Sequence, residues 1–341
     1  MPAKTRVLML GGTGIISTDC TLLARQRPDV DLTLLNRGRN PSFLPPETTV
    51  LQADIGDADA VRAQLGDRTF DVVCDFISYT PSSLRHKLDL FHGRCGQYVF
   101  ISSCAAYRPD PFVLLKTEAN SVPGNTLWEY GMNKVLCERL LQEESARTGM
   151  AYTIVRPSYT YNHIRFFNPY AINHWESWTI ARRMLAGKPV VLHDDGLQLC
   201  TATHTSDFAK AFVGLWGNPL AMNQDFHITS GEYLTWKKIA AIQAEILGVT
   251  LDVRCVPAHD LYYDTLPWNP AAAQKIMHTT THDCYDSAKV AAAVPEFVCT
   301  TPFRQGIEKT IDFYLRRPDF QKVNPQWDAF FDRICQQYPG R

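Results

Sequence analysis

The sequence predicts an α/β fold, a doubly wound parallel sheet with a smaller, interleaved C-terminal lobe. Short apolar runs alternate with segments of helix length through the first half of the chain, and the first run ends in a glycine-rich turn. From Tyr159 onward the pattern changes to one rich in aromatic residues. Strands that alternate with helices of this length imply parallel pairing through right-handed crossovers.

The first element is a strand, tight turn and helix over residues 7–25. Gly11 allows the turn, and Gly14 lets the backbone approach a pyrophosphate held at the positive end of the following helix. Ser17 stands where the usual fingerprint has its third glycine, and serine is small enough for close packing of helix and strand. The segment predicts a dinucleotide site, with a plain glycine-rich turn as the alternative.

The second strand, residues 31–39, is expected to end beside the adenosine ribose. A carboxylate at this point favours NAD, whereas an arginine accommodates the 2′-phosphate of NADP. The sequence offers Asn36 and Arg37, and no carboxylate that would repel a phosphate. We therefore expect NADP or NAD as cofactor, with NADP favoured; a solvated turn residue is the alternative for Arg37.

The next two strands end in further candidates for cofactor contact. Residues 49–55 end in Asp54, which can accept from the adenine amino group, and Ile55, which can cover the ring. An ordinary loop cap is an equally good interpretation of Asp54. Ile77 lies near the end of the fourth strand, residues 70–78, and is also assigned to the cofactor.

The fifth strand, residues 97–101, follows a helix that begins at Pro81, and it ends in Ser102 and Ser103. The carboxyl ends of parallel strands face the ligand crevice, so these hydroxyls are candidates for substrate contact. A hydroxyl that merely terminates a strand is the alternative.

A strongly periodic helix over residues 128–141 carries Tyr130 and Lys134 on one face, about one turn apart. A phenol with a pKa near ~10 is a poor base at neutral pH, but an adjacent ammonium and a nicotinamide cation both favour phenolate. Such pairs are common on helix surfaces, so this pair indicates a catalytic site only in combination with the other motifs.

The C-terminal half begins with an aromatic stretch, residues 159–178, whose composition suits stacking on a sugar ring and bonding to its hydroxyls. We expect it to line the cleft, with His163, Arg165 and Trp175 as substrate contacts and a packing loop as the alternative. Residues 259–283 show little periodicity and are expected to form a lobe over the active site. Further helices are predicted at 205–216, 235–247, 303–316 and 327–338, and strands at 226–229 and 251–256.

Composition and charge exclude several classes of partner. The chain has 34 basic and 35 acidic residues and a formal net charge of −1, which gives no electrostatic footprint for nucleic acid or an anionic membrane. We expect a small-molecule substrate and a cytoplasmic protein, because the first strand leaves no room for a signal peptide and no apolar run could span a bilayer. The ten cysteines lack metal-ligand spacing and are expected to be reduced, buried packing residues, Cys255 among them, with no metal site.

Six motifs occur in one order along the chain: Gly11-Gly-Thr-Gly14, Asp54-Ile55, Ser102-Ser103 with Tyr107, Tyr130-Gly-Met-Asn-Lys134, Ile154-Val-Arg-Pro157 and His204-Thr-Ser-Asp207-Phe-Ala. In this order and spacing the chain resembles the extended short-chain dehydrogenase/reductase family, of the NAD-dependent epimerase/dehydratase type. The resemblance implies a Rossmann-type sheet and an NAD(P)-dependent enzyme.

The resemblance also implies residue roles. Ser103 would hold the substrate hydroxyl or carbonyl, Tyr130 would pass the proton, and Lys134 would bind the nicotinamide ribose and depress the tyrosine pKa. The cofactor contacts it implies, together with those assigned above, are Gly11, Thr13, Gly14, Ile15, Ile16, Asn36, Arg37, Asp54, Ile55, Ile77, Ser102, Tyr130, Lys134 and Pro157. The substrate contacts are Ser103, Cys104, Tyr159, His163, Arg165 and Trp175.

Departures from the family pattern narrow the expected chemistry. Cys104 and Ala105 stand where dehydratases and decarboxylases of the family carry an acidic residue, which argues against both reactions. Tyr159 replaces an asparagine that contacts the substrate diphosphate, and residues 199–203 contain no cation for it. The family favours a nucleotide sugar, but these residues do not support one.

We therefore expect hydride transfer at a hydroxyl or keto carbon of a sugar or nucleotide sugar, by an epimerase or ketoreductase. The alternative is a non-catalytic NAD(P)-sensing or RNA-binding protein, since relatives with a similar Asn-Arg-Gly strand end resemble chloroplast RNA-binding proteins. Residues 1–157 are expected to bind the cofactor, with 202–230 rejoining them, and 158–341 to bind the substrate. The family also suggests a homodimer through the helices at 83–91 and 130–141, which would equally suit intramolecular packing.

Overall fold

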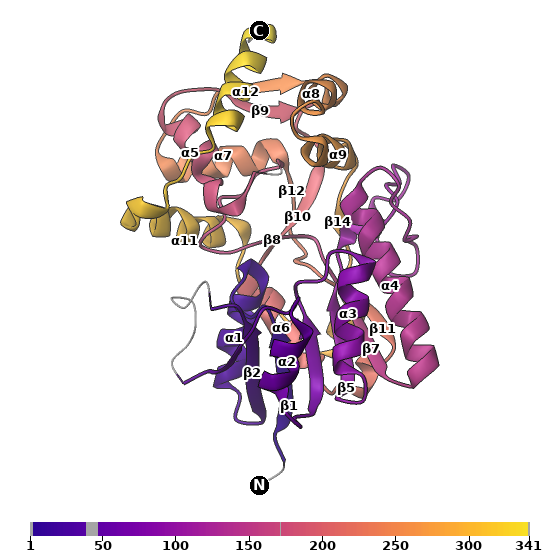
Figure 1. The fold of residues 1–341 in the computed structure, drawn as a ribbon. Coiled ribbons are helices and arrows are strands. Elements are labelled where there is room, and N and C mark those ends of the chain that lie inside the picture. Colours follow the sequence, from indigo (N-terminus) through magenta and orange to yellow (C-terminus); the bar gives the residue numbers. More distant parts are fainter. Residues whose placement is uncertain (1–2, 39–46, 171, 340–341) are drawn as a thin grey trace.

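The computed structural model describes residues 3–38, 47–170 and 172–339 (Figure 1). Residue 39, the expected end of the second strand, lies outside the described residues, as does residue 171 in the aromatic stretch. The outermost residues of the two expected domains, 1–2 and 340–341, also lie outside them.

Seven parallel strands form the central sheet, in the order β11-β7-β5-β4-β1-β2-β3, which confirms the predicted doubly wound α/β class. Because β1 lies between β2 and β4, the strand order reverses there, and the crevice at the carboxyl ends beside such a reversal is where α/β sheets bind ligands. The strands are β1 (Thr5–Leu10), β2 (Val30–Asn36), β3 (Thr49–Gln52), β4 (Phe70–Asp75), β5 (Cys95–Ile101), β7 (Ala151–Pro157) and β11 (Gln224–Ile228).

Helices cover both faces of this sheet, because its strands are apolar on both sides. Side chains alternate along β1, so Val7 and Met9 pack in one core and Leu8 and Leu10 in the other. The first core lies under α1 (Ile15–Gln26), α6 (Thr205–Gly214) and α10 (Ala288–Ala293). The second lies under α2 (Ala58–Leu65), α3 (Pro81–Phe91) and α4 (Glu129–Thr148).

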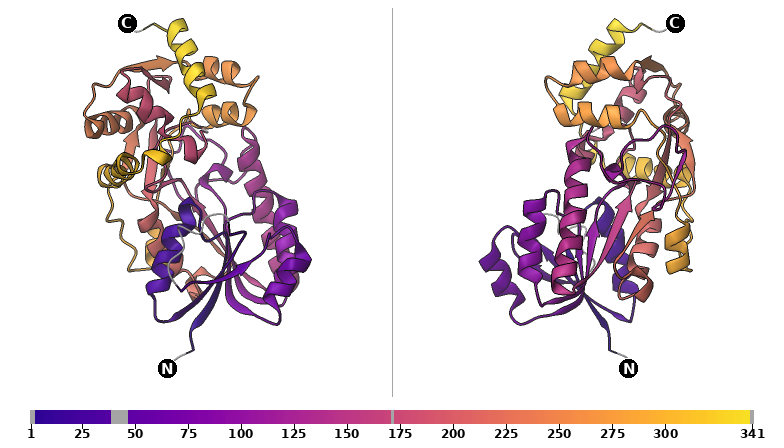
Figure 2. Two further views of the ribbon diagram at one scale, coloured as in Figure 1. Left: turned by 60° about the vertical axis from the view of Figure 1, so that its left-hand side comes forward. Right: turned by 90° about the vertical axis from the view of Figure 1, so that its right-hand side faces the viewer.

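The C-terminal lobe has a third core that is rich in aromatic side chains, among them Tyr161, Trp178, Trp236, Trp327 and Phe331. Figures 1 and 2 show this lobe at the end of the sheet opposite the N-terminus, beyond the point where β1 ends. Its strands are β8 (Tyr159–Tyr161), β9 (Val190–His193), β10 (Leu199–His204), β12 (Tyr233–Thr235) and β13 (Val253–Val256). Its helices are α5 (Trp178–Leu185), α7 (Trp236–Leu247), α8 (Ala258–Thr265), α9 (Pro270–His278), α11 (Phe303–Arg316) and α12 (Pro325–Gln337). Two short strands, β6 (Leu115–Lys116) and β14 (Cys284–Tyr285), pair with each other.

The chain passes between the two parts more than once. After β10 pairs with β8 in the lobe, α6 returns to pack against α1, and β11 extends the central sheet beside β7. The later helix α10 also joins the sheet core. The C-terminal lobe and the sheet unit are therefore interleaved along the chain.

Two elements differ from what periodicity predicts. Residues 259–283 contain α8 and α9, although the sequence showed little periodicity there. Asn269 begins α9 by accepting from the amide of Ala272 through its side chain, a local signal that the apolar pattern does not contain. All ten cysteines are unpaired thiols, and six of them are buried as expected. Contrary to expectation, Cys95, Cys299 and Cys335 are half-buried and Cys255 is exposed; among the described residues β13, which carries Cys255, pairs only with β9.

Among the described residues, no helix is both long enough and apolar enough to cross a membrane.

Candidate active site

A cavity of about 670 Å³ lies where the carboxyl ends of β1, β4, β5 and β7 meet the C-terminal lobe. The predicted residues that line it are Gly11, Thr13, Gly14, Ile15, Ile16, Arg37, Ile77, Ser102, Ser103, Cys104, Tyr130, Lys134, Pro157, Tyr159, Arg165 and Trp175. Four predicted residues, Asn36, Asp54, Ile55 and His163, are not part of its lining. Residues that the sequence did not single out also line it, among them Trp128, Lys275, His278 and Asp283.

The glycine turn forms a cradle with no room for side chains. Gly11 has φ of +86°, and a Cβ there would lie 2.6 Å from Cγ2 of Ile77. Ser17 closes the turn, since its hydroxyl donates to the carbonyl of Gly11 at 2.6 Å and accepts from the amide of Gly14 at 2.8 Å. The cradle opens at the N-terminus of α1, which begins after Gly14 and has no acidic residue in its first turn. This arrangement fits a pyrophosphate.

The residues expected at the adenosine end make contacts within the protein. The Asn36 side chain accepts from the amide of Gly12 at 3.1 Å, so it supports the glycine turn. Asp54 lies 3.8 Å from the Arg37 guanidinium and also accepts from the amide of Gly56 at 3.0 Å, as a loop cap does. The sequence placed no carboxylate beside Arg37, but the third strand brings one, and it offsets the charge that would favour a 2′-phosphate.

Ile55 packs against the core under α2 and α3, and its carbonyl is hydrogen-bonded to Nε2 of the His86 ring. His163 lies against the ring of Phe313, with centroids 4.8 Å apart, rather than in the cavity wall.

Lys134 and Tyr130 lie on the first turns of α4 and both face the cavity. The Lys134 ammonium is buried and donates to the carbonyls of Ser78 at 2.8 Å and Ile101 at 2.7 Å, which fixes it between the ends of β4 and β5. Burial lowers its pKa to about 8, so it remains largely protonated at neutral pH.

Tyr130 differs from the sequence expectation in one respect. Burial raises its pKa to about 12, and the hydrogen bond with Ser103 opposes this only in part. The expected lowering required the positive charge of the nicotinamide in addition to Lys134. The phenol of the protein alone is therefore neutral at physiological pH.

Close packing at Gly131 sets the distance between the tyrosine and the serine. A Cβ at Gly131 would lie 2.2 Å from the carbonyl oxygen of Ala105, so only glycine lets α4 approach the short turn that follows Ser103. Ser103 begins this turn, with its hydroxyl accepting from the amide of Ala105 at 3.1 Å. Gly131 is part of the motif from Tyr130 to Lys134, but the motif alone did not predict this packing role.

A buried ionic network lies behind the part of the cavity wall that contains Ser102 and the N-terminal half of α4. Glu138 on α4 accepts from the hydroxyl of Ser102 and from two guanidinium nitrogens of Arg156, at 2.9 and 2.7 Å. Arg156 also pairs with Asp225 and donates to the hydroxyl of Tyr107 at 2.7 Å. The network ties α4 to the ends of β5 and β7 and to the start of β11. It gives a structural role to Tyr107 and Arg156, two motif residues that do not line the cavity.

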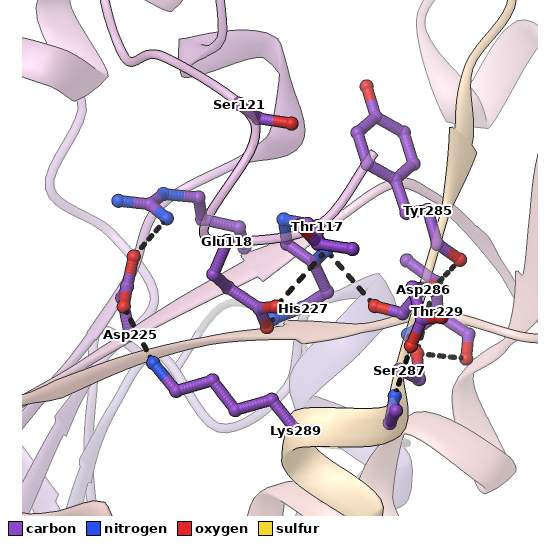
Figure 3. Close-up of polar contacts among 12 residues, drawn as sticks. Thr117, Glu118, Ser121, Asp225, His227, Thr229, Tyr285, Asp286, Ser287 and Lys289 are labelled. Carbon is purple, nitrogen blue, oxygen red and sulfur yellow. Dashed lines mark hydrogen bonds and ion pairs between the residues drawn. The ribbon is translucent and has the colours of Figure 1, made fainter. Parts of the chain in front are cut away.

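Figure 3 shows the outer end of this network, where Asp225 lies between a guanidinium and Lys289. Beside it, the ring of His227 faces the backbone carbonyl of Asp286, while its amide donates to Glu118. The opposite nitrogen of the His227 ring is 2.7 Å from the hydroxyl of Tyr107. Burial lowers the pKa of His227 to about 4, so this ring is neutral.

Another part of the cavity wall combines the N-terminus of α4 with residues of the C-terminal lobe. The Trp128 ring lies between Tyr130 and His278, with centroid distances of 4.9 and 5.3 Å. Asp283 accepts from the hydroxyls of Tyr285 at 2.9 Å and Tyr159 at 3.3 Å. The described residues contain no group of His, Cys, Asp and Glu side chains that could hold a metal ion.

The site therefore has room for a dinucleotide along the ends of β1 and β4. The phenol of Tyr130, the amine of Lys134 and the hydroxyl of Ser103 line the same cavity. This arrangement suits proton transfer coupled to hydride transfer.

Comparison with known proteins agrees with this geometry. Residues 7–228 match the NAD dependent epimerase/dehydratase family. Among curated proteins, the chain is 27% identical over 260 residues to the chloroplast stem-loop binding protein of 41 kDa b of Arabidopsis thaliana, covering 72% of this chain and 64% of that protein. It is 28% identical over 173 residues to the UDP-glucose 4-epimerase of Azospirillum brasilense, covering 45% of this chain and 49% of that enzyme. The chain thus spans 64% and 49% of the length of these two relatives.

Solved structures show the same fold. The UDP-glucose 4-epimerase of Thermotoga maritima, solved with UDP-glucose, superposes with a TM-score of 0.72 at 15% identity, over 92% of this chain and 100% of that one. The UDP-glucuronic acid 4-epimerase of Bacillus cereus, solved with NAD, gives a TM-score of 0.71 at 15% identity, over 92% and 99%.

Proposed function

The chain belongs to the NAD dependent epimerase/dehydratase family, and from this premise we propose that it catalyses NAD(P)-dependent hydride transfer at a hydroxyl or keto carbon of a sugar or nucleotide sugar. The observation that carries the proposal is that Ser103, Tyr130 and Lys134 share one cavity with the glycine turn. A protein that only bound the cofactor would need the turn alone.

The cavity fits the dinucleotide that this chemistry requires. The backbone of residues 11–16 would hold the pyrophosphate, and the cradle at Gly11 supports this because a side chain there would collide with Ile77. Pro157 and Ile77 would flank the nicotinamide, and Lys134 would bind its ribose. The cofactor supplies the hydride acceptor or donor.

The protein's own residues manage the proton. Ser103 holds the reacting oxygen of the substrate, and the hydroxyl of Tyr130 takes or returns its proton. The Lys134 ammonium favours the phenolate once the site is filled, which offsets the effect of burial on the Tyr130 pKa. The aromatic wall around Trp128 excludes water from the reacting carbon.

We propose an epimerase or ketoreductase rather than a dehydratase. Cys104 and Ala105 are buried directly after Ser103, and the Cys104 thiol donates to the carbonyl of Arg156. Asp283 does reach the cavity from the lobe, but it already accepts from two tyrosine hydroxyls and lies 3.4 Å from the Lys116 ammonium.

We propose NADP or NAD as cofactor and retain the preference for NADP only as a point to be tested, since Asp54 lies beside Arg37. Residues 1–157 with 202–230 are proposed to bind the cofactor, and 158–341 the substrate. A homodimer through α3 and α4 is part of the same proposal. Its alternative, intramolecular packing, has support from the Arg85–Glu144 ion pair of 2.7 Å between these helices.

The test is the Tyr130→Phe variant of the full chain, assayed with UDP-glucose, UDP-glucuronic acid and their free sugars for epimer formation and for changes in nicotinamide absorbance. We expect turnover to fall by roughly 10²-fold or more while the affinity for NADH changes less than about threefold, because only the proton path is lost. Tyr263→Phe, at an exposed tyrosine of α8, is the matched control. Turnover by Tyr130→Phe at the wild-type rate would contradict the proposal.

A second candidate function is RNA binding. The relative that aligns over 260 residues, more than the curated epimerases do, is named a stem-loop binding protein. The formal net charge of −1 weighs against it, because binding to phosphates depends on clustered cations. A gel shift with a stem-loop RNA at physiological salt separates the two, since tight binding that weakens steeply with salt would favour this candidate.

A further inference from the structure

Two cations from the C-terminal lobe reach the cavity without a carboxylate partner. Arg165 follows β8 and donates to the carbonyl of Thr160 at 3.0 Å. Lys275 on α9 is only 6% exposed and donates to the carbonyl of Tyr170 at 2.8 Å. Within the described part of the chain, neither side chain lies in an ion pair. A guanidinium has five N–H donors and an ammonium three, so most of their donors remain available to a ligand.

Three other buried cations of this protein have more acceptors than Lys275 has, although one guanidinium nitrogen of Arg183 has no partner among the described residues. Arg156 pairs with Glu138 and Asp225, and Arg183 with two aspartates of α12. Lys87, which has no carboxylate, donates instead to three oxygens of Ser78 and Ser83, at 2.9, 3.1 and 2.7 Å. The Lys275 ammonium has the same three donors as Lys87 but contacts a single acceptor, so two of its donors remain unused.

We propose that the substrate of this site carries a carboxylate or phosphate group, bound by Arg165 and Lys275. The inference rests on the proposed function and narrows its substrate to an anionic sugar. Burying charges without partners is costly, and an anion that accepts from both side chains removes that cost when it binds. Burial lowers the pKa of Lys275 to about 7, and the positive charge of Arg165 contributes to this lowering. Burial also lowers the pKa of Arg165 from its usual value.

The position of these cations indicates where the anionic group lies on the substrate. The ammonium of Lys275 is 5.9 Å from the ring centroid of Tyr159. Arg165 lines the same cavity as Tyr159 and Tyr130, and its charge opposes the raised pKa of both phenols. An anion held there is attached to the sugar ring or to its nearest substituent, close to the carbon that exchanges hydride.

This placement differs from recognition of a distant diphosphate. The residues that would contact a diphosphate in related enzymes are replaced by Tyr159 and by the uncharged segment 199–203. Asp283, a carboxylate in the cavity wall, already pairs with Lys116 and accepts from the hydroxyls of Tyr159 and Tyr285. It is therefore not the counter-ion of Lys275.

The experiment is isothermal titration of the full chain, saturated with NAD⁺, with four probes: D-glucuronate, D-glucose 6-phosphate, D-glucose and inorganic phosphate. We expect at least one of the charged sugars to bind about tenfold or more tightly than D-glucose, because hydrogen bonds to charged groups contribute that much. The carboxylate and phosphate probes show which anion the site prefers. Equal affinity for D-glucose and both charged sugars would overturn the inference.

Variants locate the binding. Lys275→Met and Arg165→Met should each remove about tenfold or more of the preference for the charged sugar, whereas Lys238→Met, at an exposed lysine of α7, should leave it unchanged. An unchanged preference in both cavity variants would overturn the assignment. NADH affinity is measured on each protein in parallel. If the wild type does not bind NADH, the proposed function is refuted. If it binds NADH but does not prefer a charged sugar over D-glucose, only this inference is refuted.

Discussion

The cost of keeping Lys275 charged predicts that its removal stabilises the empty protein. Burial lowers the pKa of this side chain from 10.5 to about 7. Each pKa unit corresponds to ~1.36 kcal/mol, so the charged form destabilises the folded state by roughly 4–5 kcal/mol at neutral pH and below. Lys275→Met removes this cost but leaves the carbonyl of Tyr170 without its donor, which costs about 1–2 kcal/mol. We expect a net gain of about 2–4 kcal/mol.

The pH dependence of this gain follows from the direction of the pKa shift. Above about pH 10.5 the lysine is neutral in both states, so variant and wild type should be equally stable apart from the lost hydrogen bond. Between pH 10.5 and about 7 the unfolded chain binds a proton that the folded protein does not, so the wild type loses stability relative to the variant as the pH falls. The difference should be largest and constant below about pH 7. Arg165, His278 and Tyr159 face the same ammonium and are common to both proteins, so they largely cancel in the comparison.

The assay is urea denaturation of the full chain, followed by tryptophan fluorescence at several pH values between 6 and 10, with Lys238→Met as the matched control. The control should change the free energy of unfolding by less than about 0.5 kcal/mol, as exposed substitutions do. The reasoning is refuted if Lys275→Met is less stable than the wild type at pH 6–7. It is also refuted if the difference does not shrink as the pH rises.

Three other substitutions test the part of the cavity wall formed by α4 and the proposed contact of Arg37 with the cofactor. Gly131→Ala should cost about 1–3 kcal/mol of unfolding free energy and most of the turnover, because its Cβ would lie 2.2 Å from the Ala105 carbonyl; full activity in a turnover assay would contradict this. Glu138→Gln leaves the buried Arg156 partly uncompensated and should lower the unfolding free energy by about 3 kcal/mol, and an unchanged urea midpoint would show that the network contributes little. Arg37→Ser should weaken NADPH binding by about tenfold and NADH binding much less, as measured by fluorescence titration; an equal effect on both would remove the case for NADP.

The parts of the fold that sequence could predict are those governed by local pattern. The strands of the sheet are apolar runs bounded by turns, and Gly11 and Ser17 occupy positions that the turn requires. Tyr130 and Lys134 share a helix face simply because they are one turn apart. These features depend on neighbours in the chain, so a single sequence contains the information.

The parts that sequence could not predict depend on contacts between distant segments. Lys275, His278 and Asp283 belong to the segment expected to form a lobe over the active site, but its weak periodicity indicated neither α9 nor the side chains that line the cavity. Asn36 could face either the ribose or the glycine turn, and only the packed structure shows that it bonds to Gly12. The upward shift of the Tyr130 pKa likewise follows from burial, which residue types and their spacing do not specify.

The most direct test of the central claim is a crystal structure of the full chain soaked with NAD⁺. The account predicts that the pyrophosphate accepts from backbone amides at the N-terminus of α1, and that the nicotinamide lies against Pro157 with the hydroxyl of Tyr130 and the ammonium of Lys134 beside its ribose. A cofactor bound outside this cavity, or a Tyr130 hydroxyl that points away from the nicotinamide, would contradict it.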